Sequence, residues 1–486
     1  MDYEGLMTCE AVPEAASMIE TFRAIGYSLE TAIADIVDNS ITAGAKNIII
    51  KRIWNGGKSV ITIKDDGHGM TNDELVHAMR PGAQNPLDKR DEKDLGRFGL
   101  GLKTASFSQC RKLSVISKKN GSVNYWSWDL DYVSQCQKWN LINWIPNEFL
   151  TSLDDVSSGT LVIWSSLDRI IPSCIKADDM VYKEKFSGML EKVRNHLSMT
   201  FHRFIEDKTI NIIWGSHPIL PWNPFCTSEE KLQIFPDDIL PGNIKMKGFV
   251  LPHKLNFSTS TAYELAEGPL GWNAQQGFYV YRGKRLLLAG SWLGLFRKEE
   301  HYKLARILID LPNSQDEQWQ IDIKKSKAYP PANCKDQIEQ YAKSIRAKAE
   351  EVFRHRGKIL RQRVGQQFHP LWLDKQKDGT WTYVINRDNP LITEVKRIAK
   401  VNSNQAIDLL LKLIESNVPT KTIFIHESKD EGSHDKETTT DIETIKFTMT
   451  AMYNSFLVQG ISSEKAKDKI KSIEPFNYYE DLIDNL

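Results

Sequence analysis

Hydrophobic side chains recur at three- and four-residue spacing along residues 28–45 and predict one amphipathic helix. Its apolar positions, which would share one face turned towards a core, are Leu29, Ile33, Ile36, Val37 and Ile41. Ser28 can cap the helix start by accepting a backbone N–H bond, and no proline or glycine interrupts the segment before Gly44.

Another face of the same predicted helix is polar. Asp35, Asn39 and Thr42 follow one another at i, i+4 and i+7, with Asp38 beside them. A carboxylate and a carboxamide one turn apart could hold a water molecule and a divalent cation in register. The alternative is a surface helix whose polar residues are only solvated, and this segment alone does not decide between the two.

A strand-like alternation at residues 59–64 runs into the glycine-bearing segment DDGHGM, residues 65–70. Gly67 and Gly69 let the backbone approach a flat ligand closely, and Asp65 can accept a hydrogen bond from an exocyclic amine. On its own, this pattern is also typical of a simple turn.

The segment GRFGLGLKTAS, residues 96–106, places three glycines before a helix. Gly96, Gly99 and Gly101 can present backbone N–H groups to an anion, with Lys103 as a nearby positive charge. A dinucleotide-binding fingerprint fits less well, because the acidic residue expected about 20 positions later at a strand end is not evident.

In this order, the three segments resemble the motifs of the GHKL ATPases, the superfamily of DNA gyrase B, heat-shock chaperones, histidine kinases and MutL. DIVDNS is similar to the N box, DDGHGM to the second box, and GRFGLGLKTAS to the glycine box that closes the lid. The strand GTLVIW at residues 159–164 is similar to the final Gly-Thr strand near the adenine. The lysine after the glycine box resembles MORC-type and bacterial MutL/MORC-like proteins, some of which occur with restriction-modification and antiviral systems.

The resemblance implies a site for ATP and Mg²⁺. Asn39 would coordinate the Mg²⁺ ion that bridges the phosphates. Asp65 would bind the adenine amino group, directly or with a water molecule that Thr160 also holds. The other residues implied in nucleotide binding are Gly67, Gly69, Met70, Gly96, Gly99, Gly101 and Lys103.

The general base of the family is usually a glutamate four residues before the asparagine, and here that position is Asp35. An aspartate is shorter by one methylene, about 1.5 Å, and misplacement of that size costs on the order of 100-fold in rate. We therefore expect ATP binding with slow turnover, and ATP acting chiefly as a clamp that dimerises two chains.

The family also implies a lysine that the second domain returns to the γ-phosphate. The segment WQIDIKKSK at residues 319–327 occupies the corresponding place, and Lys327 is the first candidate by its spacing from the strand-like residues 321–323. Lys324 or Lys325 are the alternatives within that segment. The other interpretation is a basic surface loop.

The succession of patterns predicts an α+β fold with three parts. A Bergerat-type α/β sandwich ATPase domain is expected over residues 1–175, a transducer-type α/β domain over 176–332, and a mostly helical region over 333–486. Strands are predicted at 47–54, 59–64, 123–130, 159–164, 277–282, 285–289, 304–311 and 381–385, and helices at 13–25, 182–205, 334–364, 392–417 and 441–459.

Two predicted segments allow more than one role. Residues 71–95 carry a short helix before Pro81 and are otherwise rich in Gly, Asn, Asp and charge, which favours an ATP lid. The helix at 13–25 could cross to a dimer partner or pack on its own domain. The helix at 334–364 could likewise pair with another chain or pack on the second domain.

Composition and charge narrow the possibilities. Lys plus Arg equals Asp plus Glu at 63 each, so a nucleic-acid surface would have to be local. The densest basic run, which could contact phosphate or be a solvated face, is Arg354, Arg356, Lys358, Arg361 and Arg363. Six scattered cysteines without metal spacing indicate reduced thiols. No apolar run approaches the ~20 residues of a membrane span, and the acidic N-terminus is atypical of a signal peptide, so we expect no membrane association and a cytoplasmic protein.

Three function classes follow. The first is an ATP-gated homodimeric clamp on DNA, in DNA repair, restriction or antiviral defence, with partner proteins of such a system. The second is a chaperone-like ATPase that remodels protein clients. The third, a kinase of the histidine-kinase branch, is disfavoured because the first histidine is His68, within the ATP-binding motifs. The MutL/MORC-like glycine box and the basic run favour DNA, and no nuclease motif is visible downstream.

Overall fold

The structure, a computed structural model, divides the chain into two compact units, residues 1–350 and 351–486. It describes residues 13–82, 101–315, 318–321, 328–354, 369–377, 380–399, 404–419, 442–476 and 479–486. Both units combine helices with strands, which confirms the predicted α+β fold class.

A seven-stranded sheet organises the first part of unit 1, with the strand order β4-β3-β5-β2-β1-β6-β7. Its strands are β1 (Asn47–Ile53), β2 (Val60–Asp65), β3 (Lys112–Lys119), β4 (Ser122–Asp129), β5 (Gly159–Ser165), β6 (Asn211–Trp214) and β7 (His217–Pro218). Neighbouring strands are antiparallel, except that β1 and β6 run parallel.

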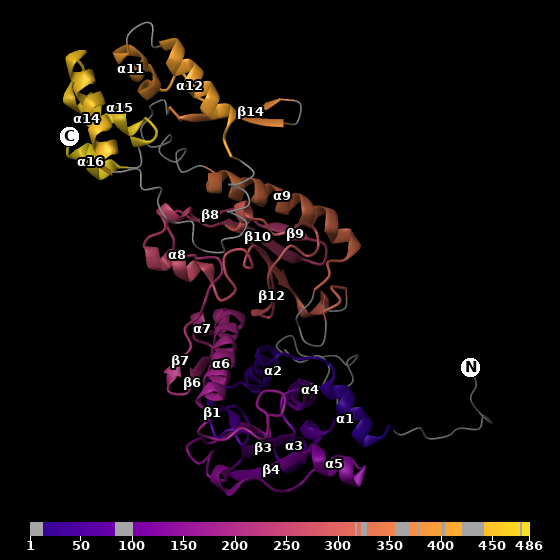
Figure 1. The fold of residues 1–486 in the computed structure, drawn as a ribbon. Coiled ribbons are helices and arrows are strands. Elements are labelled where there is room, and N and C mark those ends of the chain that lie inside the picture. The colour runs from indigo at the N-terminus through magenta and orange to yellow at the C-terminus, as the bar shows by residue number, and fades with distance from the viewer. Residues whose placement is uncertain are drawn as a thin grey trace. The chain divides into compact units, whose positions relative to one another are not determined.

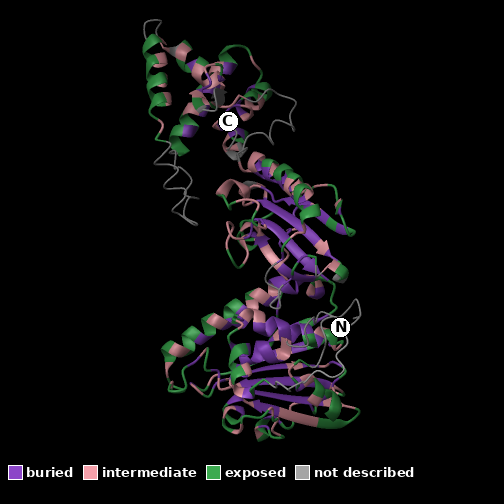
Figure 2. Ribbon diagram, turned by 90° about the vertical axis from the view of Figure 1, so that its right-hand side faces the viewer, coloured by how far each residue is buried: buried purple, intermediate pink, exposed green. Residues whose placement is uncertain are grey.

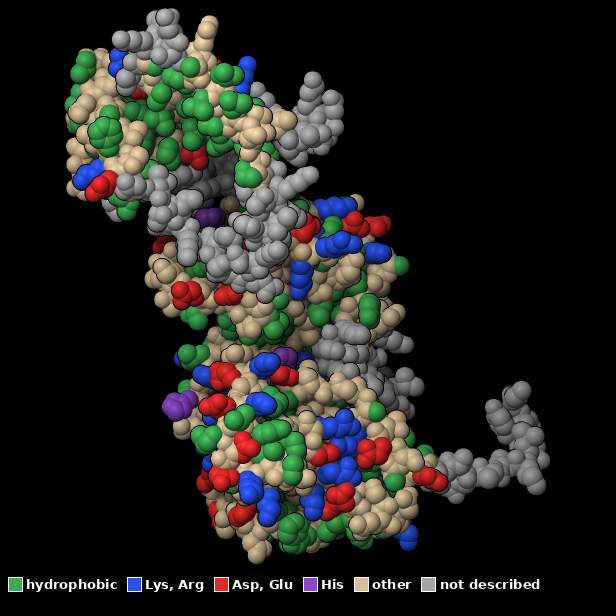
Figure 3. Space-filling model, viewed as in Figure 1, with side chains coloured by type: hydrophobic (Ala, Val, Ile, Leu, Met, Phe, Trp, Pro, Cys, Tyr) green, Lys and Arg blue, Asp and Glu red, His purple; other side chains and the backbone are tan. Residues whose placement is uncertain are grey.

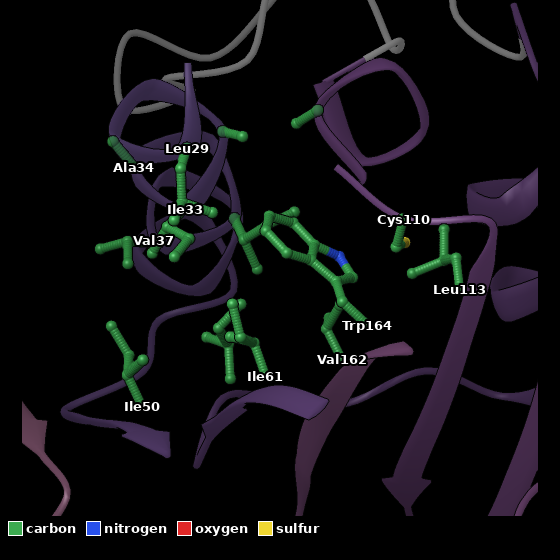
Figure 4. Close-up of a cluster of buried hydrophobic side chains, with 14 of the residues drawn as sticks. Leu29, Ile33, Ala34, Val37, Ile50, Ile61, Cys110, Leu113, Val162 and Trp164 are labelled. Carbon is green, nitrogen blue, oxygen red and sulfur yellow. The ribbon is translucent and has the colours of Figure 1, made fainter. Parts of the chain in front are cut away.

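Helices cover one face of this sheet (Figure 1). They are α1 (Ala15–Arg23), α2 (Leu29–Thr42), α3 (Asn72–Met79), α4 (Gly101–Phe107), α5 (Leu130–Cys136), α6 (Met180–Thr200) and α7 (His202–Glu206). Figure 4 shows Ile33 and Val37 of α2 beside Ile61 of β2 and Trp164 of β5, in one buried cluster. The amphipathic helix predicted at residues 28–45 is thus α2, and its apolar stripe is the layer between helix and sheet.

Strand β5 shows how the sheet separates its two faces. Val162 and Trp164 point to the helical layer, whereas Leu161 and Ile163 belong to a second cluster on the opposite face. Alternate strand residues face opposite sides, so an unbroken apolar run is expected of a strand that is covered on both faces. Strand β5 is buried from Gly159 to Trp164, and Figure 2 shows the strands of this sheet as mostly buried.

Helix α1 packs on its own domain. Ala15 and Ile19 are buried in the first core, and the Arg23 side chain is 3% exposed. Its Nη1 donates to the carbonyl oxygens of Phe107 at 2.8 Å and Cys110 at 3.0 Å, and Nη2 donates to Asp168 at 2.6 Å. Of the two arrangements considered for this helix, the structure has the intramolecular one.

Replacing Arg23 with methionine is expected to destabilise the first domain by about 2–4 kcal/mol, because two buried carbonyl groups and Asp168 lose their donor. Urea unfolding measures the change. Glu20→Gln on the same helix is the control: its 3.5 Å contact with Arg23 is exposed on the glutamate side, so about 0.5 kcal/mol or less is expected. Equal losses in the two variants would contradict the buried anchor.

The second part of unit 1 is a six-stranded sheet with the order β12-β11-β13-β10-β8 and with β9 paired to β10. Its strands are β8 (Gln233–Ile234), β9 (Asp238–Leu240), β10 (Ile244–Val250), β11 (Gly277–Arg282), β12 (Arg285–Ser291) and β13 (Ala305–Leu311). The hairpin β11–β12 and strand β13 are the elements predicted at 277–289 and 304–311. Helix α8 (Ser260–Glu267) lies in the connection between β10 and β11.

Helices α9 (Ala332–Arg354) and α6 pack against the second sheet. Helix α9 buries the stripe predicted from the sequence, including Ile338 and Ile345. Its Tyr341 hydroxyl accepts the N–H of Gly248 in β10 at 2.7 Å and donates to the carbonyl oxygen of Pro236 at 2.8 Å. The first part of α9 therefore packs on the second sheet. Helix α6 spans both parts, since Leu197 lies in the first core and Met199 in the core under the second sheet.

Unit 2 is a hairpin followed by helices, as the predicted mostly helical region required. Its elements are β14 (Trp372–Lys377), β15 (Thr380–Ile385), α11 (Pro390–Ile398), α12 (Asn404–Ser416), α14 (Ile442–Val458), α15 (Ser463–Lys471) and α16 (Glu480–Asp484). The helix predicted at 392–417 is two helices, α11 and α12, and Asn389 caps the first of them by accepting the N–H of Leu391. The core of unit 2 includes Met449 and Met452 of α14 and Ile470 of α15.

Three further expectations concern the domain boundaries, the cysteines and membrane-spanning helices. The domain boundaries at 175 and 332 stay predictions, although the first sheet takes its last two strands from residues beyond 175. The five cysteines that are described, Cys110, Cys136, Cys174, Cys226 and Cys334, are free thiols. Within the described part of the chain, no helix combines the length and the apolar character needed to cross a membrane.

Candidate nucleotide site

Helix α2 supplies two buried carboxylates and an exposed carboxamide. Its start is fixed by Ser28, whose Oγ accepts the N–H of Thr31 at 3.3 Å. Asp35 and Asp38 are 3% and 1% exposed, whereas Asn39 lies at the surface. The helix therefore leaves an amide oxygen open to a ligand and holds the two carboxylates in the interior.

Tyr27 and Arg285 both contact the carboxylate of Asp35. The Tyr27 hydroxyl donates to Oδ2 at 2.8 Å, and Nη2 of Arg285 lies 3.6 Å from Oδ1. Burial and the neighbouring Asp35 carboxylate raise the pKa of Tyr27, so the phenol keeps its proton and acts as the donor. The carboxylate also faces the start of α4, because a Cβ added at Gly101 would lie 3.8 Å from Asp35 Oδ2.

Arg285 reaches α2 from the first residue of β12 in the second sheet. Its side chain is 3% exposed, and Nε lies 2.8 Å from Oδ1 and 2.7 Å from Oδ2 of Asp38. One guanidinium thus contacts both buried carboxylates of the helix. The sequence did not indicate this residue.

Asp65 ends β2 and pairs with Thr160 of β5 in the sheet register. Its Oδ1 accepts the N–H groups of Gly67 at 3.0 Å and Thr160 at 3.2 Å, and its Oδ2 accepts the hydroxyl of Ser40 at 2.8 Å. Burial raises the pKa of Asp65, and these three donors oppose that shift. The carboxylate is therefore held in one orientation at the end of the strand.

The two glycines after Asp65 are required by close backbone contacts. A Cβ at Gly67 would lie 2.9 Å from both the side chain and the carbonyl oxygen of Ala43. Gly69 has φ +65°, and a Cβ there would lie 1.9 Å from the carbonyl oxygen of Lys118. These close contacts are with the protein itself, and the predicted approach of a flat ligand to the two glycines stays a prediction.

Met70 and Thr160 meet through Ser117 of β3. The Met70 N–H donates to Ser117 Oγ at 2.8 Å, and that hydroxyl lies 3.0 Å from Thr160 Oγ1. The structure thus brings Asp65, Met70 and Thr160 into one polar group at the ends of β2, β3 and β5.

Lys103 is the third residue of α4, which begins at Gly101. Its ammonium group is buried and donates to the carbonyl oxygen of Ala78 in α3 at 2.9 Å. Burial lowers the pKa of Lys103 to about 8. The predicted role of this lysine beside the phosphates stays a prediction.

Several candidates lie outside the described residues. Gly96 and Gly99 of the glycine box are among them, as is the larger part of the proposed lid at 71–95, which the structure describes up to residue 82. Lys327 and its alternatives Lys324 and Lys325 are also outside the described residues. Their proposed contacts with phosphate therefore rest on the sequence motifs.

The residues of this site could bind Mg²⁺ only together with ligands from the nucleotide and water. No group of three or more His, Cys, Asp or Glu side chains that could hold a metal occurs among the residues with described positions. Mg²⁺ is usually bound by one or two protein oxygens together with phosphates and water. The exposed amide of Asn39 fits such a site, with nucleotide oxygens completing the coordination.

Helix α2 and the ends of β2, β3 and β5 carry the described residues of the predicted GHKL motifs. Residues 27–160 match the family described as Histidine kinase-, DNA gyrase B-, and HSP90-like ATPase. The first domain of the chain belongs to this superfamily, as the motifs predicted.

Similar proteins carry MORC and MutL names. The chain is 32% identical over 93 residues to "ATPase morc-1" of Caenorhabditis elegans, covering 19% of this chain and 10% of the relative. It is 25% identical over 220 residues to "Protein MICRORCHIDIA 6" of Arabidopsis thaliana, covering 44% and 26%. It is 36% identical over 92 residues to "DNA mismatch repair protein MutL" of Dictyoglomus turgidum, covering 18% and 16%. The matched segments thus span about a quarter or less of each relative's own length.

The residues that sequence reasoning missed support the motif residues. Tyr27 and Arg285 hold Asp35, while Ser40 and Ser117 hold Asp65 and Thr160. Ser40 had a signal, since it directly follows Asn39 on the same helix. Tyr27 is also near in sequence, eight residues before Asp35, although no motif marked it. Ser117 and Arg285 are distant in sequence, and only the packing of the strands and of the second sheet brings them to the site.

Proposed function

We propose that this chain is a Mg²⁺-dependent ATPase that hydrolyses ATP slowly and works as an ATP-gated homodimeric clamp on DNA. One observation carries the proposal. The site contains a buried, fixed Asp65 at the end of a strand, and helix α2 beside it carries the buried Asp35 and the exposed Asn39. The match of residues 27–160 to an ATPase family supports the same activity.

Asp65 is suited to bind the adenine amino group. Both of its oxygens accept bonds from the protein, and each carboxylate oxygen can accept more than one bond. Because these bonds fix the carboxylate, the remaining acceptor capacity has a defined direction. Thr160 is adjacent and could hold a bridging water molecule through its hydroxyl.

Asp35 is suited to activate water. In the proposed step, a water oxygen forms a bond to the γ-phosphorus, the bond from that phosphorus to the β–γ bridging oxygen breaks, and Asp35 takes a proton from the water. Mg²⁺, held by Asn39 and the phosphates, would neutralise charge on the phosphate oxygens. We expect slow turnover because the aspartate is shorter than the glutamate usual at this position.

The glycine box and two lysines would complete the phosphate site. Backbone N–H groups of Gly96, Gly99 and Gly101 would face the β- and γ-phosphates, with Lys103 nearby. Lys327 would contact the γ-phosphate only when the second domain closes on the first, so that ATP and ADP are distinguished by domain closure.

The DNA part of the proposal rests on similarity and on one basic segment. A relative is named for DNA mismatch repair, and a role in repair, restriction or antiviral defence would follow for this chain. On the face of unit 1 in Figure 3, Lys and Arg side chains lie among Asp and Glu side chains. The candidate DNA contacts are therefore local: the basic run from Arg354 to Arg363, whose side chains lie outside the described residues.

The test measures ATP turnover and molar mass in solution. We expect turnover well below the ~10 s⁻¹ of a median enzyme, acceleration by DNA, and a dimer with Mg²⁺ and a non-hydrolysable ATP analogue. Asn39→Ala should weaken Mg²⁺-dependent analogue binding at least about tenfold, since the ion loses a ligand. Thr42→Ala is the matched control, because this exposed hydroxyl already donates to the carbonyl oxygen of Asp38.

Each part of the proposal can fail separately. A wild-type chain that stays monomeric with saturating analogue would rule out the clamp. Turnover that ignores DNA but rises with unfolded protein would favour the chaperone-like alternative. Absence of nucleotide binding would remove the ATPase proposal itself.

A further inference from the structure

The ion pairs around Arg285 join two buried carboxylates to one cation. Asp35 and Asp38 are three residues apart on α2, so their side chains lie on the same side of the helix. Arg285 Nε contacts both oxygens of Asp38, and Nη2 lies 3.6 Å from Asp35. Its remaining nitrogen, Nη1, donates to the carbonyl oxygen of Leu286 at 3.3 Å.

This geometry requires arginine. Two like charges one turn apart repel each other, and burying both without a counter-charge is unfavourable. The planar guanidinium carries donors on three nitrogens, so it can address two carboxylates and a carbonyl group at once. A lysine ammonium at the same place is a point charge with a different reach.

We propose that Arg285 is a positioning residue that fixes Asp35 for water activation and thereby makes hydrolysis depend on the second sheet. The inference rests on the proposed function, since it assumes that Asp35 is the base. Tyr27 holds Oδ2 and Arg285 flanks Oδ1, so the short carboxylate is held from both sides. Because Arg285 is the first residue of β12, its ion pairs with α2 exist only while the β11–β12 hairpin lies against that helix.

A purely structural ion pair is the competing explanation, and the neighbouring contacts argue against it. The same hairpin is also held by Lys284, which bonds Asp207 at 2.6 Å, and by Tyr281, whose hydroxyl lies 2.7 Å from His202 Nε2. Arg203 adds a 2.9 Å pair with Asp310 of β13. The hairpin therefore has other attachments, and what distinguishes Arg285 is its contact with the candidate base.

The full-length protein tests this with three variants and two measurements, ATP turnover and the affinity for a non-hydrolysable ATP analogue. Arg285→Ala is expected to lower kcat at least about tenfold, since a small displacement of a reacting group has effects of this size or larger. Analogue affinity should change by less than about threefold, because binding relies on Asp65 and Asn39. Arg285→Lys should recover part of kcat.

Lys284→Ala is the matched control. It removes an ion pair of the adjacent residue, between the same hairpin and the α7 end, with both partners half-exposed at 52% and 42%. Turnover within about twofold of the wild type is expected. A similar loss of kcat in the two variants would mean that the hairpin contact matters and Arg285 does not.

Urea unfolding tests the contact between Arg285 and Asp38 without measuring turnover. Arg285→Ala and Asp38→Asn should each lower the urea midpoint, and the double variant should lower it by less than the sum, because the residues share one interaction. Additive shifts would overturn the contact. If Arg285→Ala does not fold, Arg285→Lys decides: unchanged kcat overturns the proposal, and reduced kcat with unchanged analogue affinity supports it.

The outcomes separate this inference from the function beneath it. Wild-type protein without ATP turnover would overturn both. Active wild type together with a folded Arg285→Ala variant of unchanged kcat would overturn only the positioning role. Equal losses of turnover and analogue affinity would assign Arg285 to binding or folding instead.

Discussion

Replacing Asp35 with asparagine is expected to reduce ATP turnover by about 10²–10⁴-fold, the contribution typical of a general base, while nucleotide binding persists. The amide keeps the shape of the side chain, but its uncharged oxygen is too weak a base to take a proton from water. It can still accept the Tyr27 hydroxyl, which donates to the aspartate at 2.8 Å. Phosphate release measures the loss, and calorimetry with an ATP analogue measures retained binding.

The same variant separates a clamp from a simple hydrolase. If ATP binding closes a dimer and hydrolysis opens it, Asp35→Asn should accumulate a dimer with ATP itself, where the wild type needs a non-hydrolysable analogue. Light scattering after size exclusion shows which species is present. Turnover close to the wild type would remove Asp35 from the mechanism.

Asp35→Glu tests whether the site is built for the shorter side chain. Asp35 is 3% exposed and lies between Tyr27 and Arg285. An added methylene in a packed site costs about 1–3 kcal/mol, so the longer carboxylate is expected to disturb its neighbours and lower turnover. A faster variant would show that the reach gained by the longer side chain outweighs this packing cost.

Local sequence patterns were sufficient for the elements on which the motifs lie. The Ser28 cap and the stripe from Leu29 to Val37 specify α2, since helix period and capping are short-range properties. The alternation at 59–64 and the run at 159–164 likewise gave β2 and β5. The family resemblance implied that Asp65 and Thr160 share a water molecule. That β2 and β5 are neighbours, with Asp65 opposite Thr160, is a finding of the structure, because strand pairing is a long-range property.

The contacts made across the fold were beyond the sequence. Arg285 is 247 positions from Asp38, and nothing in its hairpin specifies which helix the turn will meet. The role expected for a second-domain cation was assigned to Lys327, which lies outside the described residues, while the cation described beside α2 is Arg285. Lys103 shows the same limit: its motif predicted a charge beside phosphate, and its ammonium donates to Ala78 of α3.

The polar contacts of Asp65 make its asparagine variant a specific test of adenine binding. In Asp65→Asn, the amide oxygen can still accept the N–H groups of Gly67 and Thr160. The new NH₂ group would face Ser40, whose hydroxyl can accept it and turn its own proton to the carbonyl oxygen of Ile36, 3.4 Å away. The fold should therefore tolerate the change, whereas a ligand amine would meet a donor in place of an acceptor.

We expect Asp65→Asn to weaken binding of an ATP analogue by about 10–100-fold, since a buried polar mismatch costs about 1–3 kcal/mol. Asp66→Asn is the matched control, because Asp66 accepts the backbone N–H groups of Lys46 and Asn47 at the adjacent turn. The affinity of this variant for the ATP analogue should stay within about threefold of the wild type. A hypoxanthine nucleotide, with a carbonyl oxygen in place of the amine, should bind the wild type poorly and Asp65→Asn relatively better. If both proteins prefer adenine to the same degree, Asp65 does not contact the amine.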